Sequence, residues 1–284
     1  MNKLDSTTFR DDLDRDIVVI DIGCRWGFAD AFIHDLDIFQ LYGFDPDVDE
    51  CARLEALYAS ERINIVPKGL GEREGVTKLY ITKEPACSSL FEPIVILTQN
   101  FPGLGCAEKI GEKNIDLTTL DLWSAQEGIE FADHIKIDAQ GSELSILKGS
   151  KNILNTTRTL EVEVEFNPIY DGQPLFSDVD MFLRGYGFVL WKFTHFVHYG
   201  KEGDEALELG IDIIHHNGRS QKIKKMGGQV YWANAHYVKV DIANSAVTDR
   251  KQLIRDILLL NSLGHADLVK RLVAVLNRDN RVAK

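Results

Sequence analysis

The chain of 284 residues contains only four cysteines, and none of them has the neighbours that a zinc or redox site requires. Cys24, Cys51, Cys87 and Cys106 form no Cys-x-x-Cys pair and have no histidine at a zinc-binding spacing. The residues before position 17 are polar and acidic, so no signal peptide is expected. These absences predict reduced thiols and a cytoplasmic location.

Positive charge and long apolar runs are also scarce. The chain has 32 Lys+Arg against 44 Asp+Glu, a formal net charge of −12. Nucleic acids and anionic membranes are bound by clustered cationic side chains, so the composition argues against both partners. No apolar run is long enough to insert into a membrane. Apolar residues nevertheless make up 44% of the chain, which is enough for the core of one large α/β domain.

Strand and helix patterns alternate along the chain, which predicts an α/β fold with a mostly parallel sheet and helices on both faces. Strands are predicted at residues 17–22, 39–44, 63–67, 76–82, 134–137, 160–166, 188–193 and 230–240, and helices at 29–36, 48–59, 119–126, 142–147 and 179–186.

Two long segments carry weak patterns. Residues 84–113 are predicted to form an irregular loop with one short helix, followed by a short strand at 115–116. Residues 194–228 are predicted to be irregular apart from a strand at 211–214. Such long loops are often functional, so both are expected to shape a ligand pocket.

Helical spacing returns near the end of the chain, where Gly264 separates two helices within residues 249–276. We therefore predict a main domain at 1–241 and a C-terminal helical extension at 242–284. The extension is either a helical hairpin packed on the domain or a contact through which the chain forms a homo-oligomer.

The first predicted strand ends in Asp21, Gly23 and Gly27 before a helix, a strand–turn–helix unit typical of nucleoside binding. A dinucleotide fingerprint places its second and third glycines two and five positions after the first, where this chain has Arg25 and Phe28. The turn therefore favours a nucleoside without a pyrophosphate, and S-adenosylmethionine is the commonest such ligand.

Asp45 follows the second strand, 22 residues after Gly23. An acid at that position accepts hydrogen bonds from both ribose hydroxyls of a nucleoside bound at the first turn. The alternative is an ordinary tight turn and a loop aspartate.

A second acidic region follows the strand at 134–137. Asp138 ends this strand, and Gln140, Ser142 and Glu143 follow it, either in a site or as caps of the next helix. The strand at 160–166 alternates Glu161, Glu163 and Glu165 with apolar residues. Because a buried parallel strand is usually apolar on both faces, either one side is wet or these acids line a site.

In order and spacing, these motifs resemble FkbM-type S-adenosylmethionine-dependent methyltransferases over residues 17–240. The matching pieces are Asp21-Ile22-Gly23-x-x-x-Gly27, Phe44-Asp45-Pro46, Cys87-Ser88-Ser89-Leu90-Phe91, Thr119-Leu120-Asp121, Ile135-Lys136-Ile137-Asp138-x-Gln140-Gly141-x-Glu143 and Glu163-Val164-Glu165-Phe166.

The resemblance implies a Rossmann-like class I methyltransferase fold with seven core strands, the last one antiparallel. It also implies methyl transfer to the oxygen of a sugar, glycan or natural-product alcohol, so the expected partner is a small-molecule or glycan acceptor. The chain departs from the family at Cys24-Arg25-Trp26, where small or apolar residues are usual. Arg25 and Trp26 either narrow the cofactor site or pack on the adjoining loop.

Candidate site residues follow from these motifs. Contacts to the cofactor are predicted for Asp21, Gly23, Cys24, Gly27, Asp45, Ser88, Asp138 and Gln140. An alcohol becomes a good nucleophile only when its proton is removed, by a histidine, a carboxylate or a metal that acidifies the hydroxyl.

Three sets of residues are candidates for that step. His195, with His198 as its neighbour, follows the strand at 188–193. Asp138 and Glu165 are the carboxylate candidates, and Asp138, Glu163 and Glu165 together suit Mg²⁺. Without a metal, these acids would hold the amino group of the cofactor or orient the acceptor. Two other functions stay open: a non-catalytic nucleoside-binding scaffold or interaction protein, and an NAD-dependent oxidoreductase, which the missing middle glycine disfavours.

Overall fold

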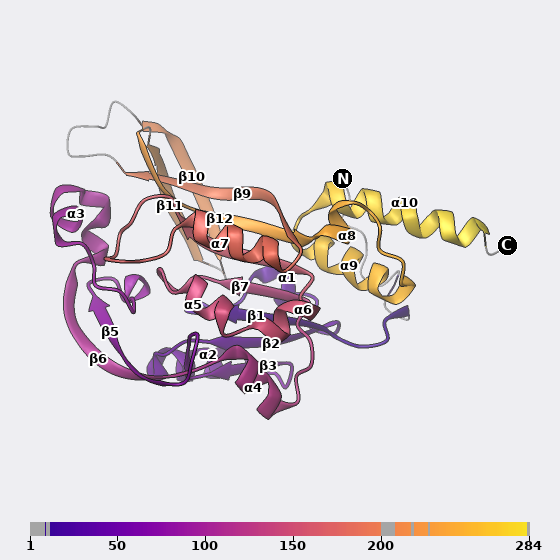
Figure 1. Cartoon of the computed structure of the whole chain (residues 1–284), viewed down its shortest axis with the longest axis horizontal. Coiled ribbons are helices and arrows are strands. Elements are labelled where there is room, and N and C mark those ends of the chain that lie inside the picture. The colour runs from indigo at the N-terminus through magenta and orange to yellow at the C-terminus, as the bar shows by residue number, and fades with distance from the viewer. Residues whose placement is uncertain (1–8, 10–11, 200–207, 217–218, 227, 283–284) are drawn as a thin grey trace.

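The structure is a computed structural model that describes residues 9, 12–199, 208–216, 219–226 and 228–282. Its centre is a seven-stranded sheet in the order β3-β2-β1-β7-β8-β12-β9 (Figure 1). These strands are β1 (Ile17–Ile22), β2 (Phe39–Phe44), β3 (Ile63–Val66), β7 (His134–Ile137), β8 (Thr159–Glu165), β9 (Phe188–Tyr199) and β12 (Gln229–Lys239). Only β12 runs antiparallel to its neighbours in this sheet, β8 and β9. The predicted Rossmann-like sheet with one antiparallel strand is therefore confirmed.

Helices cover both faces of this sheet and enclose two hydrophobic cores. The helices are α1 (Asp30–Ile33), α2 (Val48–Leu57), α3 (Val95–Asn100), α4 (Leu120–Glu127), α5 (Glu143–Lys148), α6 (Lys151–Thr156), α7 (Phe176–Gly185), α8 (Val240–Ala243), α9 (Arg250–Ser262) and α10 (Ala266–Val282). Alternation in β1 divides its side chains between the cores: Val19 packs with α2, α9 and α10, whereas Ile20 packs with α4 to α7.

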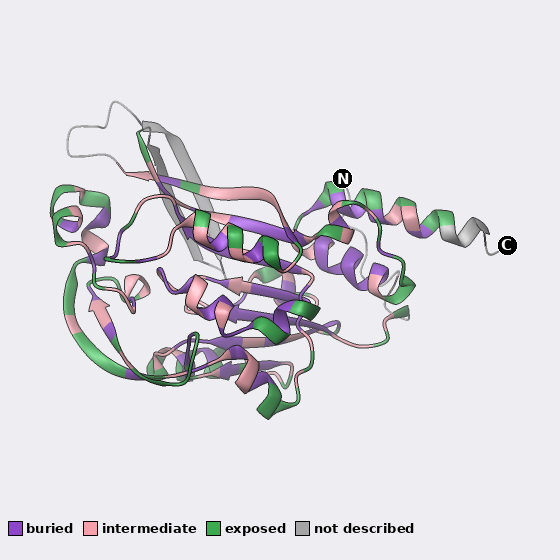
Figure 2. Cartoon of the chain, in the orientation of Figure 1, coloured by how far each residue is buried: buried purple, intermediate pink, exposed green. Residues whose placement is uncertain are grey.

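A second sheet of three strands stands beside the first in the order β4-β6-β5. Its strands are β4 (Gly69–Leu70), β5 (Gly75–Thr82) and β6 (Lys109–Thr118), and the segment between β5 and β6 contains α3 and two 3₁₀ turns, η2 (Pro85–Cys87) and η3 (Pro102–Ala107). The short helix predicted within residues 84–113 is α3 and the strand predicted at 115–116 lies within β6, but β6 already begins at Lys109, where a loop was predicted. Most of β6 is exposed (Figure 2), so it lacks the apolar alternation that reveals a strand, and its pairing with β5 holds it in place.

Two further boundaries differ from the prediction. Among the described residues of 194–228, β9 continues to Tyr199, and β10 (Glu208–His216), which contains the strand predicted at 211–214, pairs with β11 (Arg219–Met226). The first helix spans only Asp30–Ile33 instead of 29–36, and the chain then turns, with the N–H of Ile38 bonded to the carbonyl of Asp35 at 3.0 Å.

The C-terminal helices pack against the main sheet. Leu258 and Leu260 of α9 and Leu272 of α10 are buried in the same core as Val19 and Leu41 of the sheet. The predicted pair of helices separated by Gly264 is confirmed. Within the described part of the chain, no helix combines the length and apolar character needed to cross a membrane.

Candidate active site

A pocket of about 420 Å³ opens at the carboxyl ends of β1, β2 and β7. Five of the residues predicted to contact a cofactor line it: Gly23, Asp45, Ser88, Asp138 and Gln140. Its volume is in the range usual for small-molecule sites. Its position, beyond the carboxyl ends of parallel strands, is where open α/β sheets bind ligands.

Gly23 lets the first turn lie directly against the end of β7. Its φ is +78°, and a Cβ atom there would be 1.8 Å from the carbonyl oxygen of Asp138. The N–H groups of Gly23 and Cys24 both donate to the carbonyl of Phe44, at 2.9 and 3.0 Å. A side chain at position 23 would push apart the ends of the strands that form the pocket floor.

Gly27 and Cys24 shape the turn without lining the pocket. The N–H of Gly27 donates to the carbonyl of Cys24 at 2.8 Å, and Gly27 has a φ of +94°. The thiol of Cys24 is fully buried, and burial raises its pKa well above the usual value. Both residues therefore stabilise the turn on its side away from the pocket.

Asp45 presents a buried carboxylate to the pocket and is only 6% exposed. One oxygen accepts the N–H of Asp47 at 2.8 Å, and the other lies 4.0 Å from Nε of Arg25. Burial raises the pKa of Asp45, while the bond from Asp47 and the charge of Arg25 oppose that rise. Among the described residues, the second oxygen has only this long contact to Arg25, so it can still accept a hydrogen bond from a hydroxyl group.

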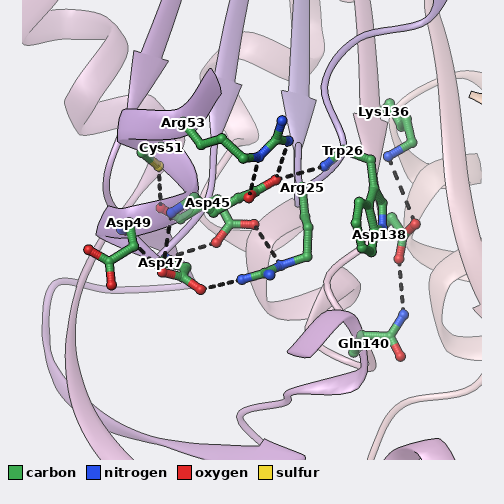
Figure 3. A network of polar contacts seen from close by, with 11 residues as sticks. Arg25, Trp26, Asp45, Asp47, Asp49, Cys51, Arg53, Lys136, Asp138 and Gln140 are labelled. Atoms are coloured by element: carbon green, nitrogen blue, oxygen red, sulfur yellow. Dashed lines mark hydrogen bonds and ion pairs between the residues drawn. The ribbon is translucent and has the colours of Figure 1, made fainter. Parts of the chain in front are cut away.

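Arg25 and Trp26 both line the pocket. Arg25 turns toward Asp47 and Asp45, away from Asp138 and Gln140 (Figure 3), and its guanidinium forms an ion pair with Asp47. Trp26 has a φ of +80°, a strained conformation for a residue with a side chain, and its N–H donates to Glu50 at 3.1 Å. The two residues that depart from the family pattern therefore form part of the pocket wall.

The opposite wall is apolar and was missed at the sequence level. Leu79 and Ile81 of β5 and Ile115 and Leu117 of β6 line the pocket together with Leu70. Leu79 and Ile81 are two positions apart in the predicted strand at 76–82, so their shared face was a usable signal. The wall suits the flat, apolar faces of a nucleobase.

A network of polar groups closes the end of the pocket near β7. Nε2 of Gln140 donates to Asp138 at 3.0 Å and to Glu163 of β8 at 2.8 Å. The side chain of Asp138 is 38% exposed, and Lys136 lies 3.9 Å from its second oxygen. Asp138 is therefore the carboxylate of this network that a ligand in the pocket can reach.

The three glutamates behind Asp138 are buried. Burial raises the pKa of Glu143, Glu163 and Glu165, and neighbouring carboxylates add to the rise at each. Glu143 accepts the N–H groups of Ala139 and Gly141, at 2.9 and 3.2 Å, as a cap would. Within the described residues, no group of three or more His, Cys, Asp or Glu side chains is arranged to hold a metal ion, so the geometry gives Mg²⁺ no support.

Other predicted residues lie elsewhere. Asp21 accepts from Nζ of Lys136 at 3.1 Å and lines a separate cavity of about 190 Å³ between β1, β7, β8 and the end of α9. His195 has a φ of +54° in β9 and does not line the larger pocket; burial lowers the pKa of His236 to about 3, and the charges of Lys192 and His195 add to this. Glu163 and Glu165 lie behind the residues that line the larger pocket.

The residues of the larger pocket fit S-adenosylmethionine. Asp45 offers an oxygen to ribose hydroxyls, and the β5–β6 wall offers an apolar face to adenine. Gly23 leaves the backbone at the pocket floor uncovered by a side chain.

Comparisons with known proteins agree with this geometry. A family model described as "Methyltransferase FkbM domain" matches residues 21–190. The chain is 27% identical over 172 residues to the 2-O-methyltransferase NoeI of Sinorhizobium fredii (strain NBRC 101917 / NGR234), a match that covers 58% of this chain and 71% of that protein.

Solved structures of methyltransferases are more distant. A TehB-like SAM-dependent methyltransferase from Corynebacterium glutamicum is 9% identical, with 82% of this chain and 86% of that chain covered and a TM-score of 0.36. A precorrin-6y C5,15-methyltransferase from Geobacter metallireducens is 8% identical, with the same coverage of both chains and a TM-score of 0.38.

Proposed function

This chain belongs to the FkbM methyltransferase family and is an S-adenosylmethionine-dependent methyltransferase, and we propose that it methylates a hydroxyl oxygen of a sugar, glycan or natural-product alcohol. The observation that carries the proposal is the family match together with a pocket that joins Gly23 and Asp45 to Asp138. The relative whose name specifies 2-O-methylation supports oxygen as the acceptor atom.

The cofactor supplies an electrophilic methyl group when it is bound, so the protein mainly has to align it with the acceptor. In the proposal, Asp45 holds the ribose and the β5–β6 wall holds the base. Gly23 and Ser88, which both line the pocket, also contact the cofactor.

Asp138 is proposed to take the proton of the acceptor hydroxyl. Among the catalytic candidates Asp138, Glu165 and His195, it alone lines the pocket. Its side chain is partly exposed, which gives an acceptor access, and Lys136 and Gln140 fix its position. Glu165 is only 2% exposed and would act from behind Asp138.

The test is transfer of isotopically labelled methyl from S-adenosylmethionine to a panel of glycosides and other alcohols, followed by identification of the methylated atom. We expect an O-methyl product. We also expect Asp45→Asn to weaken binding of S-adenosylhomocysteine by about 10–150-fold, because a charged hydrogen-bond partner worth about 1.5–3 kcal/mol is lost. Glu55→Gln, on the exposed side of α2, serves as the control.

The rival functions give different results. Methylation only of nitrogen or carbon would contradict O-methylation. Tight cofactor binding without transfer to any acceptor would favour the scaffold, and binding of NAD in place of S-adenosylmethionine would favour the oxidoreductase.

A further inference from the structure

Both polar atoms of the Gln140 side chain form hydrogen bonds within the site. Its Nε2 donates one hydrogen bond to Asp138 and one to Glu163, at 3.0 and 2.8 Å. Its Oε1 accepts from the hydroxyl of Tyr170 at 2.9 Å. The amide nitrogen therefore faces the two acids and the amide oxygen faces the hydroxyl of Tyr170, so the amide is held on both sides.

The backbone of Gln140 is also held in an unusual conformation. Its φ is +52°, a region that residues with long side chains rarely occupy, and Gly141 follows at +93°. The carbonyl of Gln140 accepts from the hydroxyl of Ser89 at 2.6 Å. Strain of this kind persists where the surroundings enforce it, as they do at functional sites.

Three parts of the chain therefore meet at one side chain. Asp138 and Gln140 follow β7, Glu163 belongs to β8, and Tyr170 precedes α7. The hydroxyl of Tyr170 also lies 2.8 Å from the carbonyl of Cys87, next to Ser88 in the pocket wall. The contacts of Gln140 thus connect the exposed acid, the buried acid and the loop that covers them.

We propose that Gln140 is a positioning residue, which holds Asp138 in place and keeps it apart from Glu163 by donating to both, so that Asp138 accepts the proton of the methyl acceptor. The sequence predicted that Gln140 contacts the cofactor, whereas this inference gives it a role that acts through Asp138. It rests on the proposed function, in which Asp138 is the proton acceptor.

The physical reason is the repulsion between two acids. Asp138 raises the pKa of Glu163, and burial is the larger cause of that rise. Without the amide between them, the two acids would share one proton as paired acids do, and Asp138 would no longer be free to accept a proton from the methyl acceptor. The other ionisable groups that interact with the pair are Lys136 on β7, Glu143 on α5, Glu165 on β8, Tyr170, Tyr199 on β9 and Cys87.

The experiment compares Gln140→Met, which keeps the length of the side chain and removes both donors, with Gln126→Met on the exposed side of α4 as the matched control. We expect Gln140→Met to lower kcat by about 100-fold, while KM for the acceptor and Kd for S-adenosylhomocysteine change by less than about twofold. The acidic limb of its kcat profile moves to higher pH. Gln126→Met leaves all four quantities unchanged.

A second readout needs no acceptor. The side-chain carboxyl ¹³C signals of Asp138 and Glu163, assigned with Asp138→Asn and Glu163→Gln, are followed by NMR as the pH is lowered. In Gln140→Met we expect the signals of both acids to change together with pH. The proton that the two acids share should leave at a higher pH than the corresponding proton in the wild type.

An unchanged limb and an unchanged titration would overturn the inference. An equal loss of affinity for S-adenosylhomocysteine and of activity would instead make Gln140 a cofactor contact. If the wild-type protein methylates no hydroxyl at all, the proposed function fails, and the NMR titration alone then decides whether Gln140 separates the two acids.

Discussion

At the scale of single residues, Arg25 has two opposing effects on Asp45. Its guanidinium lies 4.0 Å from the carboxylate that is proposed to hold the ribose, so it competes for that oxygen. Its charge also lowers the pKa of Asp45 and thereby offsets part of the effect of burial. Asp47 holds Arg25 in place through an ion pair, and Figure 3 shows the three side chains together.

The two effects can be separated by pH. Burial raises the pKa of Asp45, so this acid is ionised above its folded-state pKa and becomes protonated as pH falls through it. In Arg25→Met the opposing charge is gone, and the pKa rises further. We predict that affinity for S-adenosylhomocysteine is equal to or tighter than wild type at alkaline pH, and is lost at a higher pH than in wild type on acidification, measured by calorimetry.

The control is Arg278→Met, which removes an exposed arginine of α10 whose Nε donates to the carbonyl of Ala274 at 3.3 Å. We expect its binding profile to follow the wild type. Weaker binding of the Arg25→Met protein at every pH by the same factor would instead show that Arg25 contacts the cofactor directly.

The same scale shows what individual residues reveal in a sequence. Gly23 and Asp45 were predictable, because a turn and an acid at the ends of neighbouring strands must meet at one edge of a sheet. Asp21 was less so, since strand alternation turns its side chain toward Lys136 and away from the larger pocket. His195 depends on a local irregularity in the pairing of β9 with β12, which no spacing in the sequence shows.

At the scale of elements, β6 was harder to predict than its partner β5, which the strand predicted at 76–82 matches. β6 has charged and polar residues on both faces, so its register is set only by its pairing with β5. This pairing places Ile115 and Leu117 opposite Thr77 and Gly75 and supplies half of the apolar pocket wall. A contact between distant segments thus created a part of the site that local patterns do not contain.

One buried ion pair joins β8 to α9 and allows a prediction about stability. Arg158, immediately before β8, donates to both oxygens of Asp256 at 3.0 and 2.8 Å, and Asp256 is only 1% exposed. We predict that Arg158→Met lowers the free energy of unfolding by about 3–5 kcal/mol, because a buried carboxylate is left without its partner. Urea denaturation measures this loss.

The sign of its pH dependence follows from Asp256. Burial raises the pKa of Asp256 and Arg158 opposes the rise, so the carboxyl of the variant is protonated more easily. The loss of stability is therefore greatest above the folded-state pKa and smaller at acidic pH. Asp256→Leu combined with Arg158→Met should recover most of the stability, whereas Arg184→Met, in an exposed pair with Asp180, should change nothing measurable. If Arg158→Met alone were as stable as the wild type, the ion pair would contribute nothing to the free energy of unfolding.

At the scale of the whole molecule, the two cores depend on different parts of the chain. The core on one face is built from β1, β7 and β8 with α4 to α7. All of its residues lie within the first 241, and none of them comes from α9 or α10. The other core takes Leu253, Ile257 and Leu260 from α9 and Leu268 and Leu272 from α10. The apolar side of α10 therefore packs against its own chain. The predicted homo-oligomer would have to form through the remaining surface of α9 and α10.

This arrangement suggests a test of the predicted domain boundary at residue 241. A protein ending there would expose the apolar side chains of β1 and β2 that α9 and α10 cover, including Val19 and Leu41. We predict that residues 1–241 alone lose cooperative thermal unfolding and aggregate, because exposed apolar area of this kind is costly to hydrate. Calorimetry and size-exclusion chromatography of the two proteins measure the difference, and the elution volume of the full chain tests for a homo-oligomer. A shortened protein that unfolds cooperatively and still binds S-adenosylhomocysteine would show that the extension is a separate unit. In that case the pocket would depend only on the core formed with α4 to α7, on which Ile22 and Phe44 already lie.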